Sequence, residues 1–202
     1  MLTKPFYMGL FEVTQKQWEL VTGENPSSRK GETRPVDRVS YDMIRGNKKG
    51  AKWPASGDVD KSSFLGKLRM KSGIAFDLPT EAQWEYACRA GTTTRFSYGD
   101  MVDDAYMWYN ANSGDQMREV GMLKPNPWGF YDMHGNAMEW CLDWFWLLAY
   151  GVDPKGLAAG TERILRGGCC WQREERSSVS RKTNDPSRLD RAFGLRLCAP
   201  AQ

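Results

Sequence analysis

Five cysteines are the residues of this chain best suited to chemistry, because a thiolate can act as a nucleophile or bind a soft metal ion. Cys169 and Cys170 are adjacent in "RGGCCWQ", and neighbouring side chains in an extended segment point to opposite sides. Cys88 and Cys141 stand among aromatic residues, which is typical of small buried hydrophobic side chains. An odd number of cysteines without close spacing argues against a scaffold built on disulfides. We therefore expect no disulfide framework and no bond between Cys169 and Cys170.

The single histidine, His134 in "DMHGN", limits the metal and acid–base chemistry that the chain can carry. A facial iron site uses imidazole and carboxylate ligands, so one histidine excludes a multi-histidine centre. A Ser–His–Asp arrangement needs only one histidine, but no "GxSxG" elbow accompanies it. We expect His134 to be a hydrogen-bonded turn residue rather than a general base.

The segment 166–197 carries charges of both signs with almost no periodicity. Large, charged and small side chains follow one another without a helical or strand repeat, so core packing does not dictate them. Such a pattern indicates either a surface that presents side chains or ordinary solvated loops.

Composition places the chain among ordinary globular proteins of one domain. The net charge is +3, which implies no general affinity for polyanions, so nucleic acid is not an expected partner. No apolar run is long enough to span a membrane. The start lacks the pattern of a signal peptide. A lipid anchor outside this sequence stays open, and so does a cytoplasmic location.

The elements that must position these residues are helices first and short strands later. Thr14 and Thr80 each precede a helical pattern with glutamine three residues on, which is the spacing of a capping box. Gly23 and Gly91 should end these two helices. Residues 46–64 are polar and rich in turn residues, so they predict a surface insertion.

The second half of the chain predicts long loops and few strands. Residues 92–130 are irregular, and loops of this length need aromatic, proline or metal anchors. "RILRGG" and "AFGLRLC" then read as strands. Helices followed by strands, without regular βαβ alternation, predict an α+β fold.

Six segments, in order and across nearly the whole chain, resemble the formylglycine-generating-enzyme (sulfatase-modifying factor) family. They are "MGLFEVTQKQWELVTGENPS", "RPVDRVSYDM", "LPTEAQWEYACRAGT", "NPWGFYDMHGNAMEWCLDW", "RILRGG" and "GLRL". The resemblance implies one C-type-lectin-like domain over residues 1–202, with low regular secondary structure and long loops. The family includes copper oxidases that make formylglycine, iron enzymes, and noncatalytic binding proteins, so the fold alone does not decide the function.

The oxidase of this family holds copper(I) with two cysteines at fixed positions after "GG". Copper(I) needs a pair of soft sulfur ligands there. In this chain those positions hold Gln172 and Ser177, and neither side chain is a thiolate. We therefore expect no enzyme and no catalytic cofactor, with an atypical oxidase as the alternative.

The family resemblance also implies a calcium loop in "YDMHGNAMEW". The matching positions give side-chain oxygens from Asp132 and Glu139 and backbone carbonyls from Gly135 and Ala137. Hard oxygen ligands of this kind suit a structural calcium ion. The alternative is that the two carboxylates cap turns and pair with arginines.

Within the family, the chain most resembles the variable proteins of diversity-generating retroelements, whose C-terminal segment is mutated to make new ligand-binding surfaces. A framework of glycine, arginine and proline is kept here, and mixed residues lie between its members. The resemblance implies a macromolecular ligand, a protein rather than nucleic acid, and a cell-surface or extracellular location. A noncatalytic relative of another purpose is the alternative. The expected ligand-binding residues within 166–197 are Trp171, Gln172, Arg173, Glu175, Lys182, Asn184, Arg188, Asp190, Arg191 and Ala192.

Overall fold

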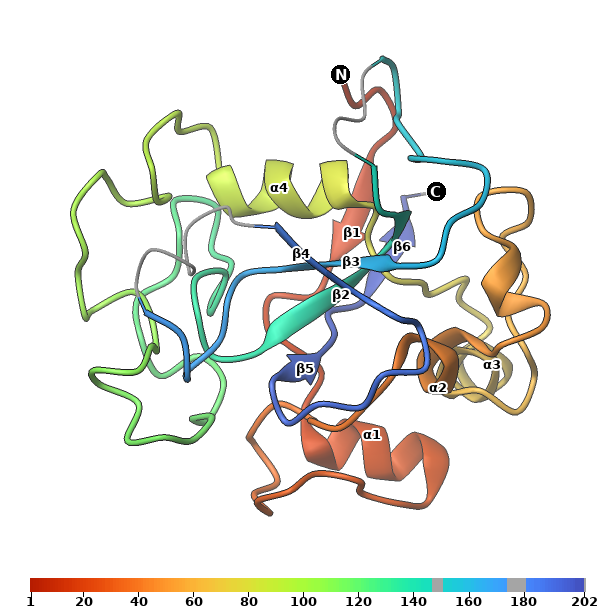
Figure 1. Cartoon of the computed structure of the whole chain (residues 1–202), viewed down its shortest axis with the longest axis horizontal. Helices are drawn as coiled ribbons and strands as arrows, with labels where there is room; N and C mark the ends of the chain where they lie inside the picture. The colour runs from red at the N-terminus through yellow and green to blue at the C-terminus, as the bar shows by residue number, and fades with distance from the viewer. Residues whose placement is uncertain (147–150, 174–180, 202) are drawn as a thin grey trace.

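The computed structural model describes residues 1–146, 151–173 and 181–201 (Figure 1). Two small sheets, four α-helices and one short 3-10 helix account for its regular structure in these ranges, and long loops connect them. Glu175 and Ser177, two positions singled out above, lie outside the described residues. Among the described helices, none is long and apolar enough to cross a membrane.

A four-stranded sheet forms the centre of the molecule, with strand order β4-β3-β2-β5 (Figure 1). The three longer strands are antiparallel, and β5 pairs with β2 in parallel. The strands are β2 (Met138–Trp144), β3 (Arg163–Arg166), β4 (Arg181–Asn184) and β5 (Phe193–Gly194). The segment 166–197 thus contributes one edge strand, β4, and the strand at the opposite edge, β5.

Helices cover both faces of this sheet, because successive side chains of a strand point to opposite sides. Trp140 of β2 packs with three helices, and its neighbour Cys141 packs on the opposite face with the fourth helix. The three helices are α1 (Gln15–Thr22), α2 (Tyr41–Arg45) and α3 (Phe64–Ser72), and the fourth is α4 (Glu81–Arg89). Figure 1 shows α4 lying apart from the other three.

The predicted helix starts are confirmed. Thr14 and Thr80 both accept a hydrogen bond from the backbone N–H three residues on, and both capping boxes are complete. Gly23 ends α1 in the left-handed conformation that favours glycine. The predicted end of α4 at Gly91 is late by a residue, because Ala90 already adopts the left-handed conformation.

The predicted insertion 46–64 lies beside α2 and includes a short 3-10 helix (Gly50–Lys52). The buried guanidinium of Arg45 donates to the backbone carbonyls of Gly57 and Asp58, which attaches the segment to the core. Its last residue, Phe64, is buried and begins α3, so the polar part ends earlier than predicted.

The last predicted strand, "AFGLRLC", is divided into two. β5 ends at Gly194, and β6 (Cys198–Pro200) pairs instead with β1 (Phe6–Met8) in a two-stranded antiparallel sheet near the termini (Figure 1). Between them, the carbonyls of Leu195 and Leu197 accept hydrogen bonds from the N-terminal residues Val13 and Gly9. The N-terminal segment therefore takes the backbone groups that a continuous strand would use.

Candidate ligand-binding surface

Arg166 anchors the start of the segment 166–197. Its buried guanidinium contacts two acids of α4: Nε lies 3.0 Å from Glu81 Oε1, and Nη2 pairs with Glu85. Burial opposes ionisation of Glu85, but the charges and hydrogen bonds of Arg166 and Arg89 together outweigh it and lower the pKa of that carboxyl. Gly167 and Gly168 follow with φ of 93° and 73°, which only glycine adopts without strain.

Arg196 anchors the other end. It is fully buried, and its Nη2 lies 2.7 Å from Oε1 of Glu139, which is also fully buried. The Glu139 carboxylate accepts a second buried donor, Trp84 Nε1, at 2.6 Å. Burial opposes the charge of Arg196, but Glu139 and the nearby Glu12 and Asp132 overcome it and raise its pKa. Each end of the segment is therefore fixed by a buried, hydrogen-bonded arginine.

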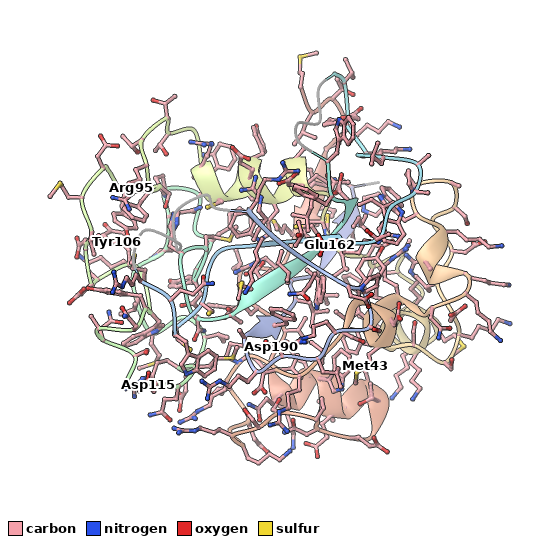
Figure 2. All side chains as sticks on the ribbon, in the orientation of Figure 1. Met43, Arg95, Tyr106, Asp115, Glu162 and Asp190 are labelled. Atoms are coloured by element: carbon pink, nitrogen blue, oxygen red, sulfur yellow. The ribbon has the colours of Figure 1, made fainter. Side chains whose placement is uncertain are left out.

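Between these anchors, most of the predicted ligand-binding residues reach the surface. They come from the turn after β3, from β4, and from the loop that joins β4 to β5. Figure 2 places Asp190, in that loop, on the lower part of the molecule, away from Arg95 and Tyr106. The exposed members are Arg173, Lys182, Arg188 and Arg191, and the partly exposed members are Trp171, Gln172, Asn184 and Asp190.

One predicted member is wrong. Ala192 is only 7% exposed and joins the core on the face of the sheet that carries α1, α2 and α3. Its carbonyl accepts the N–H of Met138, at the start of the central strand. Because its side chain packs inward beside β5, Ala192 belongs to the framework.

The edge strand β4 presents alternate residues to different surroundings. Arg181 points toward α4, where its guanidinium donates to Glu81 Oε2 over 2.7 Å. The next residue, Lys182, is exposed on the other side, with its ammonium 6.0 Å from the Phe193 ring. β4 therefore combines a framework arginine with a displayed lysine, as strand alternation requires.

Trp171 and Arg191 are brought together from the two loops. The Arg191 guanidinium lies 4.6 Å from the centre of the Trp171 ring, in the geometry of a cation–π contact. The same loop continues to Asp190, whose carbonyl accepts the N–H of Arg38. Within the described ranges, Lys182 and Asn184 form no hydrogen bond or ion pair with this Trp171–Arg191 pair.

A pocket of about 230 Å³ lies beside the Trp171–Arg191 pair. Its other wall contains three arginines from the N-terminal half, Arg29, Arg34 and Arg38. These arginines could not be predicted from the sequence as part of the surface, because more than a hundred residues separate them from Trp171. The only local indication is the density of arginine around "RPVDRVS".

The carboxylates predicted to bind calcium have other partners in this arrangement. Glu139 is engaged by Arg196 and Trp84, and Asp132 accepts the N–H of Gly121 at 2.7 Å. The Gly135 backbone lies against the Trp108 carbonyl, and this carbonyl accepts the N–H of Asn136. In the part of the chain that the structure describes, no group of three or more His, Cys, Asp or Glu could hold a metal ion. The contacts favour the alternative of turn capping and arginine pairing, and calcium stays an untested prediction.

The thiols and the histidine are buried away from the surface. All five cysteines are free, and Cys169 and Cys170 belong to different parts of the core, as their adjacency predicted. Burial raises the pKa of the Cys88 thiol to about 12, which disfavours the reactive thiolate. His134 Nε2 accepts the N–H of Ser97 at 3.1 Å, which confirms a hydrogen-bonded role.

Comparison with known proteins identifies the family. The profile of the sulfatase-modifying factor enzyme 1-like domain matches residues 1–201. The chain belongs to this family. Membership, together with the mixed helix and sheet arrangement, confirms the predicted α+β, C-type-lectin-like fold of the formylglycine-generating-enzyme type.

Relatives within the family differ in their described roles. The chain is 37% identical over 198 residues to the chaperone protein LppX of Paenibacillus barcinonensis, covering 81% of this chain and 68% of that protein. It is 36% identical over 109 residues to the formylglycine-generating enzyme of Streptomyces coelicolor, covering 45% of this chain and 35% of the enzyme. Its structure resembles Treponema denticola variable protein 1 with a TM-score of 0.82 and 27% identity, over 99% of this chain and 86% of the other.

Proposed function

We propose that this protein binds a macromolecular ligand without catalysis, and that a retroelement diversifies the segment 166–197 that makes the contact. The observation that carries the proposal is the division of that segment in space. Buried arginines hold both of its ends, while Arg173, Lys182, Arg188 and the Trp171–Arg191 pair lie at the surface between them. A rigid scaffold with free side chains between fixed points is what a surface needs if its residues vary.

The absence of a suitable thiol pair in the sequence supports the noncatalytic part of the proposal. The copper positions implied by the family hold Gln172 and Ser177. Cys170 could replace Gln172 only by leaving its place in the core beside Met117 and Ala137. Burial raises its pKa, so the thiolate that copper(I) requires is disfavoured.

The structural similarity to Treponema denticola variable protein 1 supports the diversified part, since it extends over nearly the whole chain. By the same similarity we propose a protein ligand and a location at the cell surface. The anchors Arg166 and Arg196, and Gly167 with its left-handed backbone, should stay constant in every variant, because each is tied to the core.

The proposal is tested in the genome that encodes the protein. We expect a near-identical second copy of the sequence for residues 166–197, with adenines at the codons that differ, beside a gene for a reverse transcriptase. If the locus has neither, diversification is wrong.

A second candidate function is oxidation of a substrate cysteine, because the chain shares 36% identity with a formylglycine-generating enzyme over 109 residues. Incubation with copper and a peptide carrying the CxPxR motif tests this directly by mass spectrometry. We expect the peptide mass to stay unchanged. An aldehyde product that depends on copper would establish an enzyme and contradict the noncatalytic proposal.

A further inference from the structure

We propose that the arginine pocket, defined by Arg29, Arg34, Arg38, Arg191 and Trp171, binds a carboxylate side chain of an acidic segment in the protein ligand. The inference rests on the proposed binding function and adds the chemistry of the ligand. The pocket joins two parts of the chain. Arg34 and Arg38 begin and end "RPVDR" in the N-terminal half, and Arg29 precedes it, whereas Trp171 and Arg191 belong to the segment 166–197.

The four arginines of the pocket carry positive charge without a counter-charge among the described residues. In the part of the chain that the structure describes, none of Arg29, Arg34, Arg38 and Arg191 forms an ion pair with a carboxylate. By contrast, Arg166, Arg181 and Arg196 of the segment 166–197 pair with acids. Arginines that converge on one pocket without counter-charges attract an anion.

Two of the pocket arginines hydrogen-bond to the same neutral oxygen. The side-chain oxygen of Gln116 accepts from Arg29 Nη1 at 3.3 Å and from Arg34 Nη1 at 3.2 Å. These distances are long for hydrogen bonds to an arginine, and a charged acceptor would make shorter and stronger ones. The planar fork of a guanidinium matches the two oxygens of a carboxylate.

The one acid in the pocket wall, Asp37, does not neutralise this charge. Its side chain is buried, and Oδ1 accepts the backbone N–H of Ser28 at 3.0 Å. Burial raises the pKa of Asp37, although the Ser28 hydrogen bonds and the charges of Arg38 and Lys30 oppose the shift. Asp37 therefore serves the local backbone, and among the described residues that line the pocket four are arginines and one is an acid.

Trp171 gives the pocket an apolar wall and a further donor. The Arg191 guanidinium lies 4.6 Å from the centre of its ring, and both residues line the pocket. The indole Nε1 is buried and has no acceptor within hydrogen-bonding distance in the described residues. A buried N–H without an acceptor is costly, so an oxygen that reached it would gain from the contact.

The size of the pocket favours an acidic peptide over a nucleic acid. A volume of about 230 Å³ suits a single side chain, whereas nucleic acids need a basic groove or stripe that follows the backbone. The chain has 28 basic and 25 acidic residues, so the excess charge that such a groove requires is absent overall. A local concentration of arginine beside a tryptophan is instead the composition of a protein interface hot spot.

Fluorescence polarisation with labelled peptides tests the inference on the full chain. The probe is a flexible Gly–Ser peptide that carries several glutamates, and its control is the same peptide with glutamines in their place. We expect binding of the glutamate peptide, weakened by added salt, and none of the glutamine peptide. No binding at about millimolar protein, or equal binding of both peptides, overturns the inference.

Charge-matched variants separate the pocket from a general charge effect. Arg38→Gln with Arg191→Gln should weaken glutamate-peptide binding about tenfold or more, since each removes a hydrogen bond to a charged group. Arg95→Gln with Lys52→Gln changes the net charge equally at exposed positions that do not line the pocket and should leave affinity nearly unchanged. Equal losses in the two pairs would overturn the inference.

Two further results complete the design. The melting temperature of each variant shows whether it is folded. If the double variant Arg38→Gln with Arg191→Gln does not fold, the single variant Arg191→Gln replaces it in the binding assay. An oligothymidylate of equal charge that binds more tightly than the peptide would assign the pocket to nucleic acid and overturn the inference. The genomic test of diversification is independent of these assays, so a failure of the pocket and a failure of the proposed function are distinguishable.

Discussion

Replacement of Arg196 by methionine should strongly destabilise the fold. The Arg196 and Glu139 side chains are both fully buried, and their ion pair has Nη2 and Oε1 2.7 Å apart. Without the guanidinium, the Glu139 carboxylate keeps Trp84 Nε1 but loses its counter-charge, with Glu12 and Asp132 nearby. Removal of one partner of a buried pair costs about 3 to 5 kcal/mol. For a domain of this size, that lowers the melting temperature by about 6 to 20 °C.

Two matched variants give this prediction its control. Arg188→Met makes the same exchange at an exposed arginine of the same segment, whose Nη2 lies 4.0 Å from Oδ2 of Asp190. It should change the free energy of unfolding by less than about 0.5 kcal/mol. Glu139→Gln combined with Arg196→Met removes the unpaired charge and should be more stable than Arg196→Met alone.

The assay is urea unfolding followed by circular dichroism, with calorimetry for the melting temperatures. The division of the segment into a buried framework and a displayed surface is refuted by either of two results. One is a loss below about 1 kcal/mol for Arg196→Met, which is less than breaking a buried pair allows. The other is a loss for Arg188→Met as large as that for Arg196→Met.

Three other predictions follow from buried groups. Burial raises the pKa of Asp132 to about 6 and of Asp143 to about 7, so the native protein holds protons that the unfolded chain releases above about pH 4. The free energy of unfolding should therefore fall by about 2 to 4 kcal/mol between pH 5 and pH 8. Urea unfolding at each pH measures this change, and a rise over that range would contradict the prediction. All five cysteines are buried and free, so a thiol reagent should react slowly with the native protein and rapidly with the protein unfolded in guanidinium. Fast labelling of the native protein would show that at least one thiol is accessible to solvent. Gly135→Ala should lower the free energy of unfolding by at least about 2 kcal/mol more than Gly129→Ala. Both backbones are left-handed, but only at Gly135 would the added Cβ meet another atom, the Trp108 carbonyl oxygen at 2.0 Å. Equal melting temperatures for the two variants would argue against this close approach.

Local features of the fold could be predicted from the sequence because their causes are local. Thr14 and Thr80 lie three residues from the groups they cap, so their helix starts were readable. The family motifs then supplied the C-type-lectin-like fold, which no periodicity in the chain indicates. The division of "AFGLRLC" was missed because its cause is distant: Val13 and Gly9 take the hydrogen bonds that would have continued the strand.

The candidate surface could be predicted in part, because the lack of a local repeat is itself visible in the sequence. Aperiodic charge within 166–197 predicted exposure, and Arg173, Lys182 and Arg188 are exposed. Ala192 was wrong because a small side chain fits a surface or a core equally well, and its place beside β5 decides between them. The arginine pocket could not be predicted, because its two walls meet only through tertiary folding.

Sequencing the region that encodes residues 166–197 across many cells of one population tests the central claim most directly. The account predicts substitutions concentrated at the codons of exposed residues such as Arg173, Lys182 and Arg188, with the codons of Arg166, Gly167 and Arg196 constant. A uniform sequence in every cell, or substitutions spread evenly over exposed and buried positions, would contradict it.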